Sequence, residues 1–369
     1  MPFVDLSRIH KELKEVFLSR VGSVIDRSAF VLGPEVEQFE KAFAEYCERK
    51  FAIGVSSGLD ALVVALKSLG IGPGDEVITQ TNTFIATAYA ISAVGATPVF
   101  ADVEEENFNL SPHELEKRIT SKTRAVIPVH LYGQSASMSG LSDVLKRNNI
   151  SLVEDCAQSH GAKFGDRKVG SFGSFGCFSF YPGKNLGALG EGGALVTSDP
   201  NLFEKAVAIR NVGQTRKNEH RYIAGNYRLH TLQAAFLSVK LPLLDKYNSE
   251  RNRVASLYKG YLEEVDRITF PAVAQDRNHV FHLYVIRVKD PSDRDRLIEY
   301  LGSKGIQTGI HYPTPIHLQP CYKELGYGAG DFPVAEKLAS TIISLPMFAG
   351  MTEDEVKTVA SAIKDFFTN

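Results

Sequence analysis

Alternation between strand-like and helix-like runs is the feature that most constrains the fold of this 369-residue chain. Apolar, β-rich runs occur between residues 51 and 155 at Phe51–Val55, Glu76–Thr79, Pro98–Ala101, Arg124–Val129 and Ser151–Glu154. Amphipathic helical runs separate them at Leu59–Leu69, Ile85–Val94, Ser111–Ile119 and Leu141–Asn148. This order predicts an α/β fold, with a mostly parallel sheet covered by helices on both faces.

Two later apolar runs interrupt the alternation. Gly173–Phe180 and Gly193–Thr197 follow each other with no helix between them. A crossover between parallel strands needs a dozen or more residues and is usually a helix. We therefore expect a locally antiparallel or rearranged edge in an otherwise parallel sheet.

The chain changes character after residue 199. A helical stretch runs from Leu229 to Leu262 with a break at Pro242, and the expected elements beyond it are strands at His282–Val288 and Gln307–His311 and helices at Ser292–Lys304, Pro333–Ile343 and Thr352–Phe367. We predict an N-terminal segment at 1–30 that packs with a small domain, a large domain at 31–245, and a small α+β domain at 246–369.

Composition narrows the class of protein. The formal net charge of −2 gives no sign of a nucleic-acid partner. No run reaches the roughly 20 apolar residues of a membrane-spanning helix, and the first residues resemble no signal peptide. Four scattered cysteines without CxxC spacing predict neither a disulfide framework nor a zinc site: Cys47, Cys156, Cys177 and Cys321. We expect a cytoplasmic protein of enzyme size without a metal.

One lysine stands in an unusual setting. Lys184 follows the aromatic run Phe178–Tyr181 and the Pro182-Gly183 break, and four glycines come shortly after it. Most lysines are solvated loop residues, but that many glycines would be a costly choice for a plain surface loop. A lysine held at such a turn is able to form a Schiff base with an aldehyde.

A carboxylate ends the buried strand that starts at Ser151. Asp155 stands where α/β sheets display their chemistry, although the same position also suits a turn or helix-capping residue. A carboxylate beside a protonated ring nitrogen keeps that nitrogen charged. Gln158 follows three residues later and is close enough to contact the same ring. A lysine for the aldehyde and an aspartate for the ring nitrogen are the two parts of a pyridoxal phosphate site.

A phosphate-binding turn is predicted at the first strand-to-helix junction. Val55–Asp60 supplies two hydroxyls and a glycine at a helix N-terminus, which suits a phosphate or a simple N-cap. Ser179, on the strand before Lys184, offers a further hydroxyl. Phe84, at the start of the next helix, is either a core residue or an aromatic that stacks on a cofactor ring.

A proline-rich segment near the C-terminus holds a second group of candidates. Two histidines, two tyrosines and three prolines lie within His311–Tyr322. Prolines stiffen the backbone, and polar aromatic side chains suit a hydroxyl-rich ligand, although a stiff surface connection fits the same pattern. A metal site is not expected, because no carboxylate accompanies the histidines.

Taken together, these motifs resemble the DegT/DnrJ/EryC1/StrS aminotransferases, fold-type-I pyridoxal phosphate enzymes that act on nucleotide-linked keto sugars. The resemblance covers essentially the whole chain. Its motifs are Gly58, Thr83-Phe84, Glu154–Gly161, the lysine run, Asn226–Leu229, Leu232–Ala235 and His311–Pro315. It implies a large, mostly parallel mixed-sheet domain and a smaller α+β C-terminal domain.

The resemblance also implies a role for each candidate residue. Lys184 would form the Schiff base, Asp155 would pair with the pyridine nitrogen and Gln158 would contact the ring hydroxyl. Phe84 would stack on the ring. The phosphate would be held by Ser57, Gly58, Leu59 and Ser179. Asn226 would reach the phosphate of a neighbouring subunit's cofactor, which implies a homodimer with composite sites.

Within the family, the tyrosine at position 181 makes the chain similar to the branch that aminates C3 of dTDP-linked 3-keto-6-deoxyhexoses. The branch that aminates C4 usually has histidine at this position. His311 and Tyr312 are similar to residues that border the hexose. The implied reaction is a ping-pong transamination with L-glutamate as donor and 2-oxoglutarate as product, in which the amine of Lys184 carries the proton. A UDP-sugar or C4 aminotransferase and a non-catalytic pyridoxal phosphate-binding regulator are the alternatives.

Overall fold

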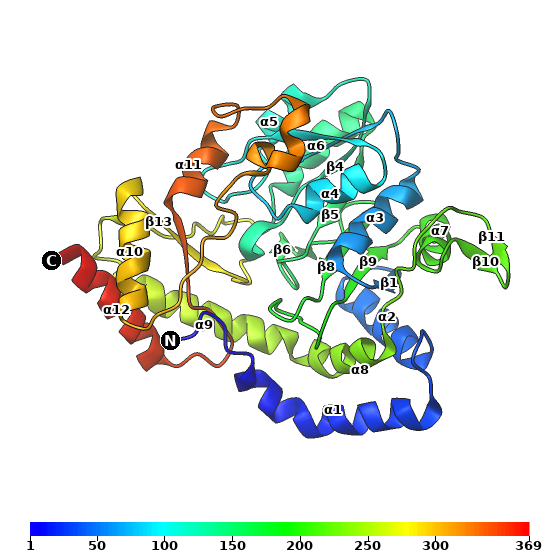
Figure 1. Cartoon of the computed structure of the whole chain (residues 1–369), viewed down its shortest axis with the longest axis horizontal. Coiled ribbons are helices and arrows are strands. Elements are labelled where there is room, and N and C mark those ends of the chain that lie inside the picture. Colours follow the sequence, from blue (N-terminus) through cyan, green and yellow to red (C-terminus); the bar gives the residue numbers. More distant parts are fainter. Residues whose placement is uncertain (369) are drawn as a thin grey trace.

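A seven-stranded sheet forms the centre of the computed structural model, which describes residues 1–368 (Figure 1). Its strands lie in the order β1-β9-β8-β5-β4-β2-β3. Their bounds are Phe51–Val55 (β1), Glu76–Gln80 (β2), Thr97–Ala101 (β3), Thr123–Ile127 (β4), Ser151–Asp155 (β5), Phe175–Ser179 (β8) and Gly193–Thr197 (β9). Each predicted strand of this region is present, with ends shifted by a few residues at most.

The sheet is parallel except at one strand. β8 pairs in parallel with β5, whereas β9 pairs antiparallel with both β8 and β1. The predicted antiparallel element is therefore β9, but it lies inside the sheet rather than at its edge. β9 lies between β1 and β8, and β8 lies between β9 and β5. The lysine run between β8 and β9 therefore starts and ends at interior strands of the sheet.

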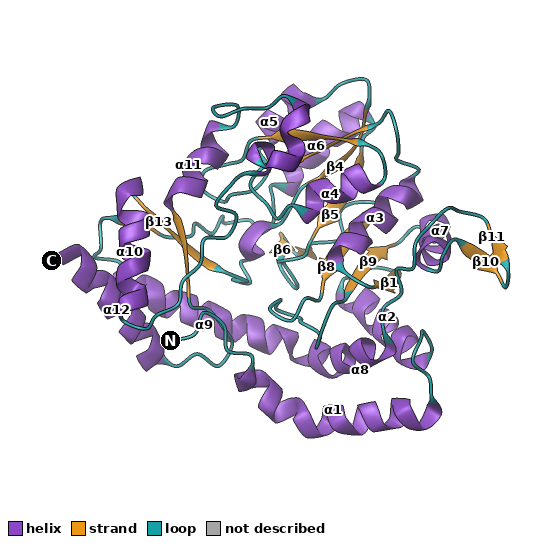
Figure 2. Cartoon of the chain, in the orientation of Figure 1, coloured by secondary structure: helices purple, strands orange, loops and turns teal. Residues whose placement is uncertain are grey.

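Helices cover both faces of the sheet, as Figure 2 shows. Strand residues alternate between the two faces: Val153 packs with the helices of one face and Leu152 with those of the other. The first face carries α3 (Gly58–Leu69), α4 (Ala86–Ala93) and α7 (Pro200–Arg210). The second carries α2 (Pro34–Tyr46), α5 (Pro112–Arg118) and α6 (Met138–Asn148). The α/β prediction is confirmed.

A second, smaller sheet forms near the C-terminus. It contains β12 (Ile268–Thr269), β13 (Tyr284–Val288) and β14 (Ile342–Leu345), with α10 (Pro291–Ser303), α11 (Pro333–Thr341) and α12 (Glu353–Thr368) around it. The prediction of a strand at 307–311 was wrong, because that segment makes only an isolated bridge between Gly309 and Ser344. The helix predicted at 333–343 ends at Thr341, where β14 takes over.

Long helices connect the two sheets. α8 (Thr231–Lys240) and α9 (Leu244–Leu262) are separated by a short 3₁₀ turn at Leu241–Leu243, which is the break predicted at Pro242. α1 (Ser7–Arg27) lies alongside α8 (Figure 1), and Met1 and Phe3 bond Gln307. The N-terminal segment thus contacts both parts of the chain. The division at 30 and 245 stays a prediction.

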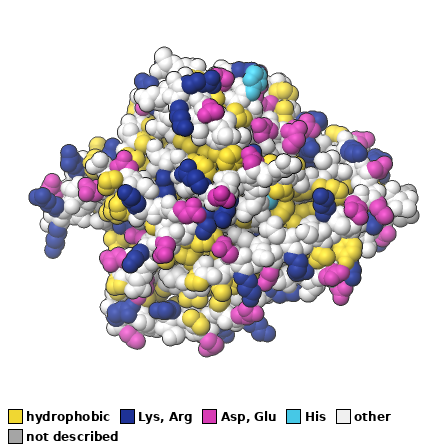
Figure 3. All heavy atoms as spheres, turned by 180° about the vertical axis from the view of Figure 1, so that it is seen from behind, with side chains coloured by type: hydrophobic (Ala, Val, Ile, Leu, Met, Phe, Trp, Pro, Cys, Tyr) yellow, Lys and Arg dark blue, Asp and Glu magenta, His cyan; other side chains and the backbone are white. Residues whose placement is uncertain are grey.

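Small elements complete the chain. Two hairpins are formed by β6 (Lys163–Phe164) with β7 (Arg167–Lys168) and by β10 (Gln214–Arg216) with β11 (Glu219–His220). Short 3₁₀ turns lie at Leu131–Gly133, Ile316–Leu318 and Pro320–Leu325. Across residues 1–368 we find no helix whose length and hydrophobicity suit a bilayer. Acidic and basic side chains intermingle on the face that Figure 3 shows.

Candidate active site

The candidate site lies where β5 and β8 end. Asp155, the last residue of β5, pairs with Cys177 in the parallel ladder, and β8 continues for two more residues to Ser179. Because side chains alternate along a strand, Val153 and Cys177 face α3 and α4, and so does Asp155. Glu154 faces the opposite side of the sheet. The alternation therefore gives two adjacent carboxylates two separate environments.

Asp155 is held by bonds to both of its oxygens. Oδ2 accepts from the Thr87 hydroxyl at 2.8 Å, and Oδ1 accepts from the Ala157 amide at 3.1 Å. Burial raises the pKa of Asp155, and these two bonds and the charge of Lys184 lower it. Asp155 is no helix cap. It is a buried carboxylate with a fixed orientation, which suits a group that must pair with a cationic ring nitrogen.

Lys184 lies in a closed turn that follows β8. Its amide donates to the Tyr181 carbonyl at 2.8 Å, and the Ala188 amide returns to the Phe180 carbonyl at 2.7 Å. Desolvation lowers the pKa of the Lys184 amine to about 8, although the charge of Asp155 opposes this shift. Within residues 1–368 the amine has no hydrogen-bond acceptor. Lys184 is therefore a partly buried lysine whose lowered pKa distinguishes it from an ordinary surface lysine.

The start of α3 and the end of β8 form a cradle. Ser57 caps α3, because its hydroxyl accepts from the Asp60 amide at 3.0 Å. A Cβ at Gly58 would lie 2.6 Å from the Cβ of Ser179, so only glycine allows this approach. Four of the predicted phosphate ligands are thereby brought together: Ser57, Gly58, Leu59 and Ser179. Amides at a helix N-terminus beside a hydroxyl suit a phosphate.

Gln158 joins the cofactor residues to the C-terminal segment. Its Oε1 accepts from the Tyr132 amide at 2.7 Å, and its Nε2 donates to the Tyr312 hydroxyl at 2.7 Å. The Tyr132 hydroxyl donates to the His311 carbonyl at 3.0 Å, and the rings of Tyr132 and Tyr312 are parallel. Gln158 is therefore oriented with its amide nitrogen towards Tyr312.

Three of the predicted residues are open to solvent. Phe84 is 59% exposed and Tyr181 is 55% exposed, so the alternative that Phe84 is a core residue was wrong. The ring centroid of Phe84 lies 6.2 Å from that of Tyr312. Asn226 is exposed as well, next to Tyr227, whose carbonyl accepts from the Ser56 amide. Exposed aromatic rings suit contact with a ligand.

His130, Glu154 and Cys156 form a buried group that resembles a metal site. The His130 and Glu154 atoms that could bind a metal are already hydrogen-bonded within the protein. Glu154 accepts from His130 Nε2 at 3.1 Å, and three backbone amides of the 170–173 loop also donate to it. His130 Nδ1 accepts from the Ala136 amide at 3.0 Å. We interpret the group as a support for the strand that carries Asp155.

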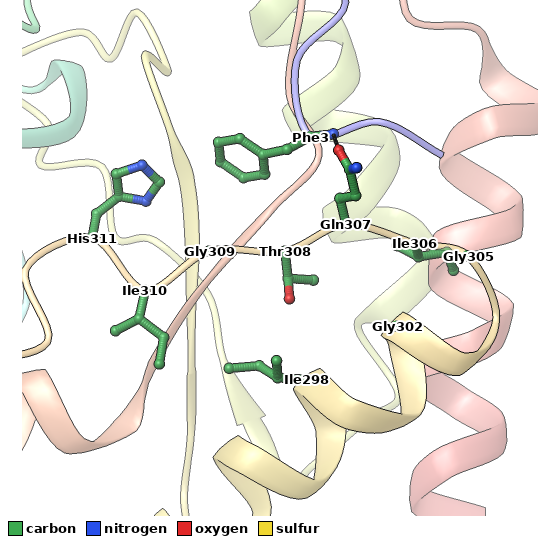
Figure 4. A pocket seen from close by; sticks show the side chains of 10 residues that line it. All are labelled: Phe3, Ile298, Gly302, Gly305, Ile306, Gln307, Thr308, Gly309, Ile310 and His311. Carbon is green, nitrogen blue, oxygen red and sulfur yellow. Dashed lines mark hydrogen bonds between the residues drawn. The ribbon is translucent and has the colours of Figure 1, made fainter.

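An open hollow of about 720 Å³ lies on the far side of His311 (Figure 4). Phe3, Ile298, Gln307 and Thr308 line it, and neither Lys184 nor Asp155 does. His311 Nδ1 is 2.8 Å from the Ser344 hydroxyl, and its ring stacks on Phe3. The hollow therefore lies between α10, the segment that follows it and the N-terminal residues, and its lining shares only His311 with the candidate site.

The residues present fit pyridoxal phosphate. The group needs an amine for its aldehyde, an anionic partner for its ring nitrogen and a cradle for its phosphate. Lys184, Asp155 and the start of α3 supply one each. The contact of Gly58 with Ser179 leaves backbone amides where a larger residue would place a side chain.

Sequence reasoning missed two residues of this site. Thr87 orients Asp155, and Tyr132 orients Gln158. Thr87 lies among apolar residues on the buried face of α4, which was a usable signal because a buried hydroxyl needs a partner. Tyr132 offered no such signal, since its bond to Gln158 comes from its backbone.

Known proteins resemble the chain over nearly its whole length. The model of the DegT/DnrJ/EryC1/StrS aminotransferase family matches residues 11–364. The chain is 42% identical over 366 residues to dTDP-3-amino-3,4,6-trideoxy-alpha-D-glucose transaminase of Streptomyces venezuelae, covering 99% of this chain and 96% of the relative. It is 43% identical over 366 residues to dTDP-3-amino-3,6-dideoxy-alpha-D-galactopyranose transaminase of Aneurinibacillus thermoaerophilus, covering 99% of each.

A solved structure agrees with these sequences. The crystal structure of S. venezuelae DesV in complex with a ketimine intermediate superposes with a TM-score of 0.96 at 42% identity, covering 100% of this chain and 98% of DesV. The sequence match, the shared fold and the arrangement of Lys184, Asp155 and the α3 cradle lead to one conclusion: the chain belongs to the DegT/DnrJ/EryC1/StrS aminotransferase family.

Proposed function

We propose that the chain is a pyridoxal phosphate-dependent aminotransferase that transfers the amino group of L-glutamate to C3 of a dTDP-linked 3-keto-6-deoxyhexose. The observation that carries the proposal is the pair formed by Lys184 and Asp155, a lysine with a lowered pKa and a buried, doubly hydrogen-bonded carboxylate that lie close enough to affect each other's pKa. The two transaminases named above act on dTDP-3-amino sugars, and they support the choice of nucleotide and of carbon.

When bound, the cofactor would supply an electron sink for chemistry at the substrate Cα. Lys184 would hold the cofactor through its aldehyde, and its amine would then act as the base and acid that moves the proton of the substrate Cα. Its amine has no competing acceptor, and its pKa of about 8 leaves a useful neutral fraction near neutral pH. Asp155 keeps the ring nitrogen protonated, and Thr87 holds its carboxylate in place.

The remaining residues bind and orient. Ser57, Gly58, Leu59 and Ser179 hold the phosphate, which uses the free amides at the start of α3. Phe84 stacks on the ring, and Gln158 donates its second amide hydrogen to the ring hydroxyl. These roles follow the family pattern and agree with the exposure of Phe84 and the orientation of Gln158.

The sugar is bounded by Tyr181, His311 and Tyr312 in this proposal. Tyr181 is exposed beside the lysine turn, and Tyr312 reaches Gln158 from the C-terminal segment. Burial lowers the pKa of His311 to about 4, so its ring is neutral and is able to accept or donate a hydrogen bond to a hydroxyl.

The working form is a cytoplasmic homodimer with composite sites. Exposed apolar side chains beside the site support a partner surface, among them Leu189 and Ile223, which is 98% exposed. Asn226 lies near Ile223 and reaches the partner's cofactor phosphate in this arrangement. Free cysteines, three of them buried, agree with a reducing compartment.

The absorbance of the lysine-bound cofactor tests the proposal. Adding L-glutamate to cofactor-loaded protein should remove that absorbance, and a dTDP-linked 3-keto-6-deoxyhexose should restore it. UDP-linked keto sugars and 4-keto sugars should be tested in the same way for comparison. Absence of any change with glutamate would refute transamination, whereas recovery only with another sugar would reassign the substrate.

A further inference from the structure

A second lysine is buried behind the lysine turn. Lys240, the last residue of α8, is 0% exposed. It makes no ion pair with a carboxylate among the described residues. Taking an ammonium out of water without a counter-charge is costly, and desolvation lowers the pKa of Lys240 to about 8. Because burying this ammonium group costs free energy, we expect it to have a specific hydrogen-bond partner.

The partner of Lys240 is the backbone of the lysine turn. Its Nζ donates to the Gly187 carbonyl at 2.8 Å and lies 5.4 Å from the centroid of the Phe236 ring. At Gly187 the chain folds back on itself, because a Cβ there would lie 2.2 Å from the Pro182 carbonyl oxygen. Lys240 therefore bonds the turn at the point where it closes.

Other anchors hold the same turn but carry no charge. Asn185 donates from Nδ2 to Asn248 Oδ1 at 2.8 Å and to the Val280 carbonyl at 3.0 Å. Lys184 thus has an anchored neighbour on its C-terminal side, and Gly187 is fixed two residues further on. A charge-assisted bond in a dry environment is stronger than a neutral one. Lys240 makes that stronger bond.

We propose that Lys240 is a positioning residue for Lys184: by bonding the Gly187 carbonyl, it fixes the turn so that the Lys184 amine points at the cofactor aldehyde before the two react. The inference rests on the proposed function, because it concerns attachment at Lys184. It assigns Lys240 no contact with cofactor or substrate.

The chain contains a matched control lysine. Lys168 also donates from Nζ to a backbone carbonyl at 2.8 Å, that of Tyr46, and it lies 3.5 Å from the centroid of the Tyr46 ring. It does not touch the turn at 181–188. Lys168→Met therefore removes the same kind of bond elsewhere in the fold.

The first experiment measures the rate at which pyridoxal phosphate attaches to cofactor-free protein, followed by stopped-flow absorbance with borohydride trapping and peptide mapping. For Lys240→Met we expect attachment at position 184 to slow by about tenfold to hundredfold. Lys168→Met should attach at the wild-type rate, and Lys240→Arg, which keeps a cationic donor, should recover most of the loss. Equal rates in Lys240→Met and Lys168→Met would overturn the inference.

A second measurement uses wild-type protein and so does not depend on whether Lys240→Met folds. In the cofactor-free protein, hydrogen exchange should show the Lys184 and Ala188 amides as protected as those of β8. Unprotected turn amides would overturn the inference, since the turn would then form only with the cofactor. If wild-type protein itself carries no adduct at Lys184, the proposed function fails instead, which separates the two failures.

Discussion

The proposed cofactor side and the proposed sugar side of the candidate site are built in different ways. On the cofactor side, Asp155 and Ser179 end two paired strands, and Lys184 follows five residues after Ser179. On the sugar side, Tyr312 lies 154 residues from Gln158 in sequence and is held by Gln158 and Tyr132. The first arrangement depends on strand register and the second on how the C-terminal segment docks.

The difference teaches how one chemistry serves several sugars. The cofactor side lies on sheet and helix ends whose positions the packed core fixes. The sugar side consists of exposed or single-bonded side chains, so substitutions there change fewer contacts. We expect mutations of the two sides to separate: the cofactor side should affect both half-reactions, and the sugar side only the half-reaction with the sugar.

The largest effect is expected for Lys184→Ala. It removes both the attachment point and the proton carrier, so both half-reactions should slow by about 10⁴-fold or more. Single-turnover absorbance with glutamate and with the keto sugar measures each half, and circular dichroism checks the fold. Lys168→Ala is the control and should stay active. Unchanged turnover of Lys184→Ala would contradict the role of Lys184 in both half-reactions, and with it the definition of the cofactor side.

Asp155→Ala should have the next largest effect. Without the carboxylate the ring nitrogen loses its anionic partner, and we expect both half-reactions to slow by about 10²-fold to 10³-fold and cofactor binding to weaken. Equilibrium titration with pyridoxal phosphate and the same single-turnover measurements apply. Thr87→Val, which removes only the bond that orients Asp155, should give a smaller loss in the same direction; kinetics unchanged in both variants would contradict the role of Asp155.

The pH dependence of attachment should report the cofactor side alone. Only the neutral amine attacks an aldehyde, and the pKa of Lys184 is lowered to about 8. The attachment rate should therefore rise about tenfold per pH unit below 8 and level off above it. His311, with a pKa lowered to about 4, stays neutral over this range. An inflection near the ordinary lysine value would show that Lys184 is not desolvated.

Tyr312→Phe should have the smallest effect and the most selective one. The change removes the hydroxyl that accepts from Gln158 and leaves the ring in place. Losing one such bond corresponds to about 0.5–1.5 kcal/mol. We expect a twofold to tenfold rise in KM for the keto sugar and an unchanged half-reaction with glutamate. An equal effect on the half-reactions with glutamate and with the keto sugar would contradict the separation between the cofactor side and the sugar side.

Much of the fold and of the cofactor side was predictable from sequence because both depend on local pattern. Apolar, β-rich runs located every strand of the large sheet, and Asp155 and Lys184 stood at or just after the ends of such runs. The position of β9 inside the sheet was not predictable, since alternation gives the elements but not their spatial order.

The C-terminal half was less predictable for a physical reason. Residues 307–311, predicted as a strand, make only an isolated bridge, whereas residues 342–345, predicted in part as the end of a helix, find a continuous partner in β13. Pairing partners decide such cases, not composition. Lys240 shows the same limit: as a basic residue at a helix end it looked ordinary, and its meaning came only from the distant carbonyl that it contacts.

Glu154 and Asp155 are adjacent acids that face opposite sides of the sheet. The alignment of β5 with β8 therefore decides which of the two lies in the candidate active site. Sliding β5 by a single position one way would put Glu154 in the place of Asp155 and Val153 among the loop amides that Glu154 now binds; sliding it the other way would put Asp155 among those amides and Cys156 in the place of Asp155. An enzyme with every residue intact would then be inert. Insertions or deletions inside β5 should accordingly be far less tolerated than substitutions on its exposed flanks.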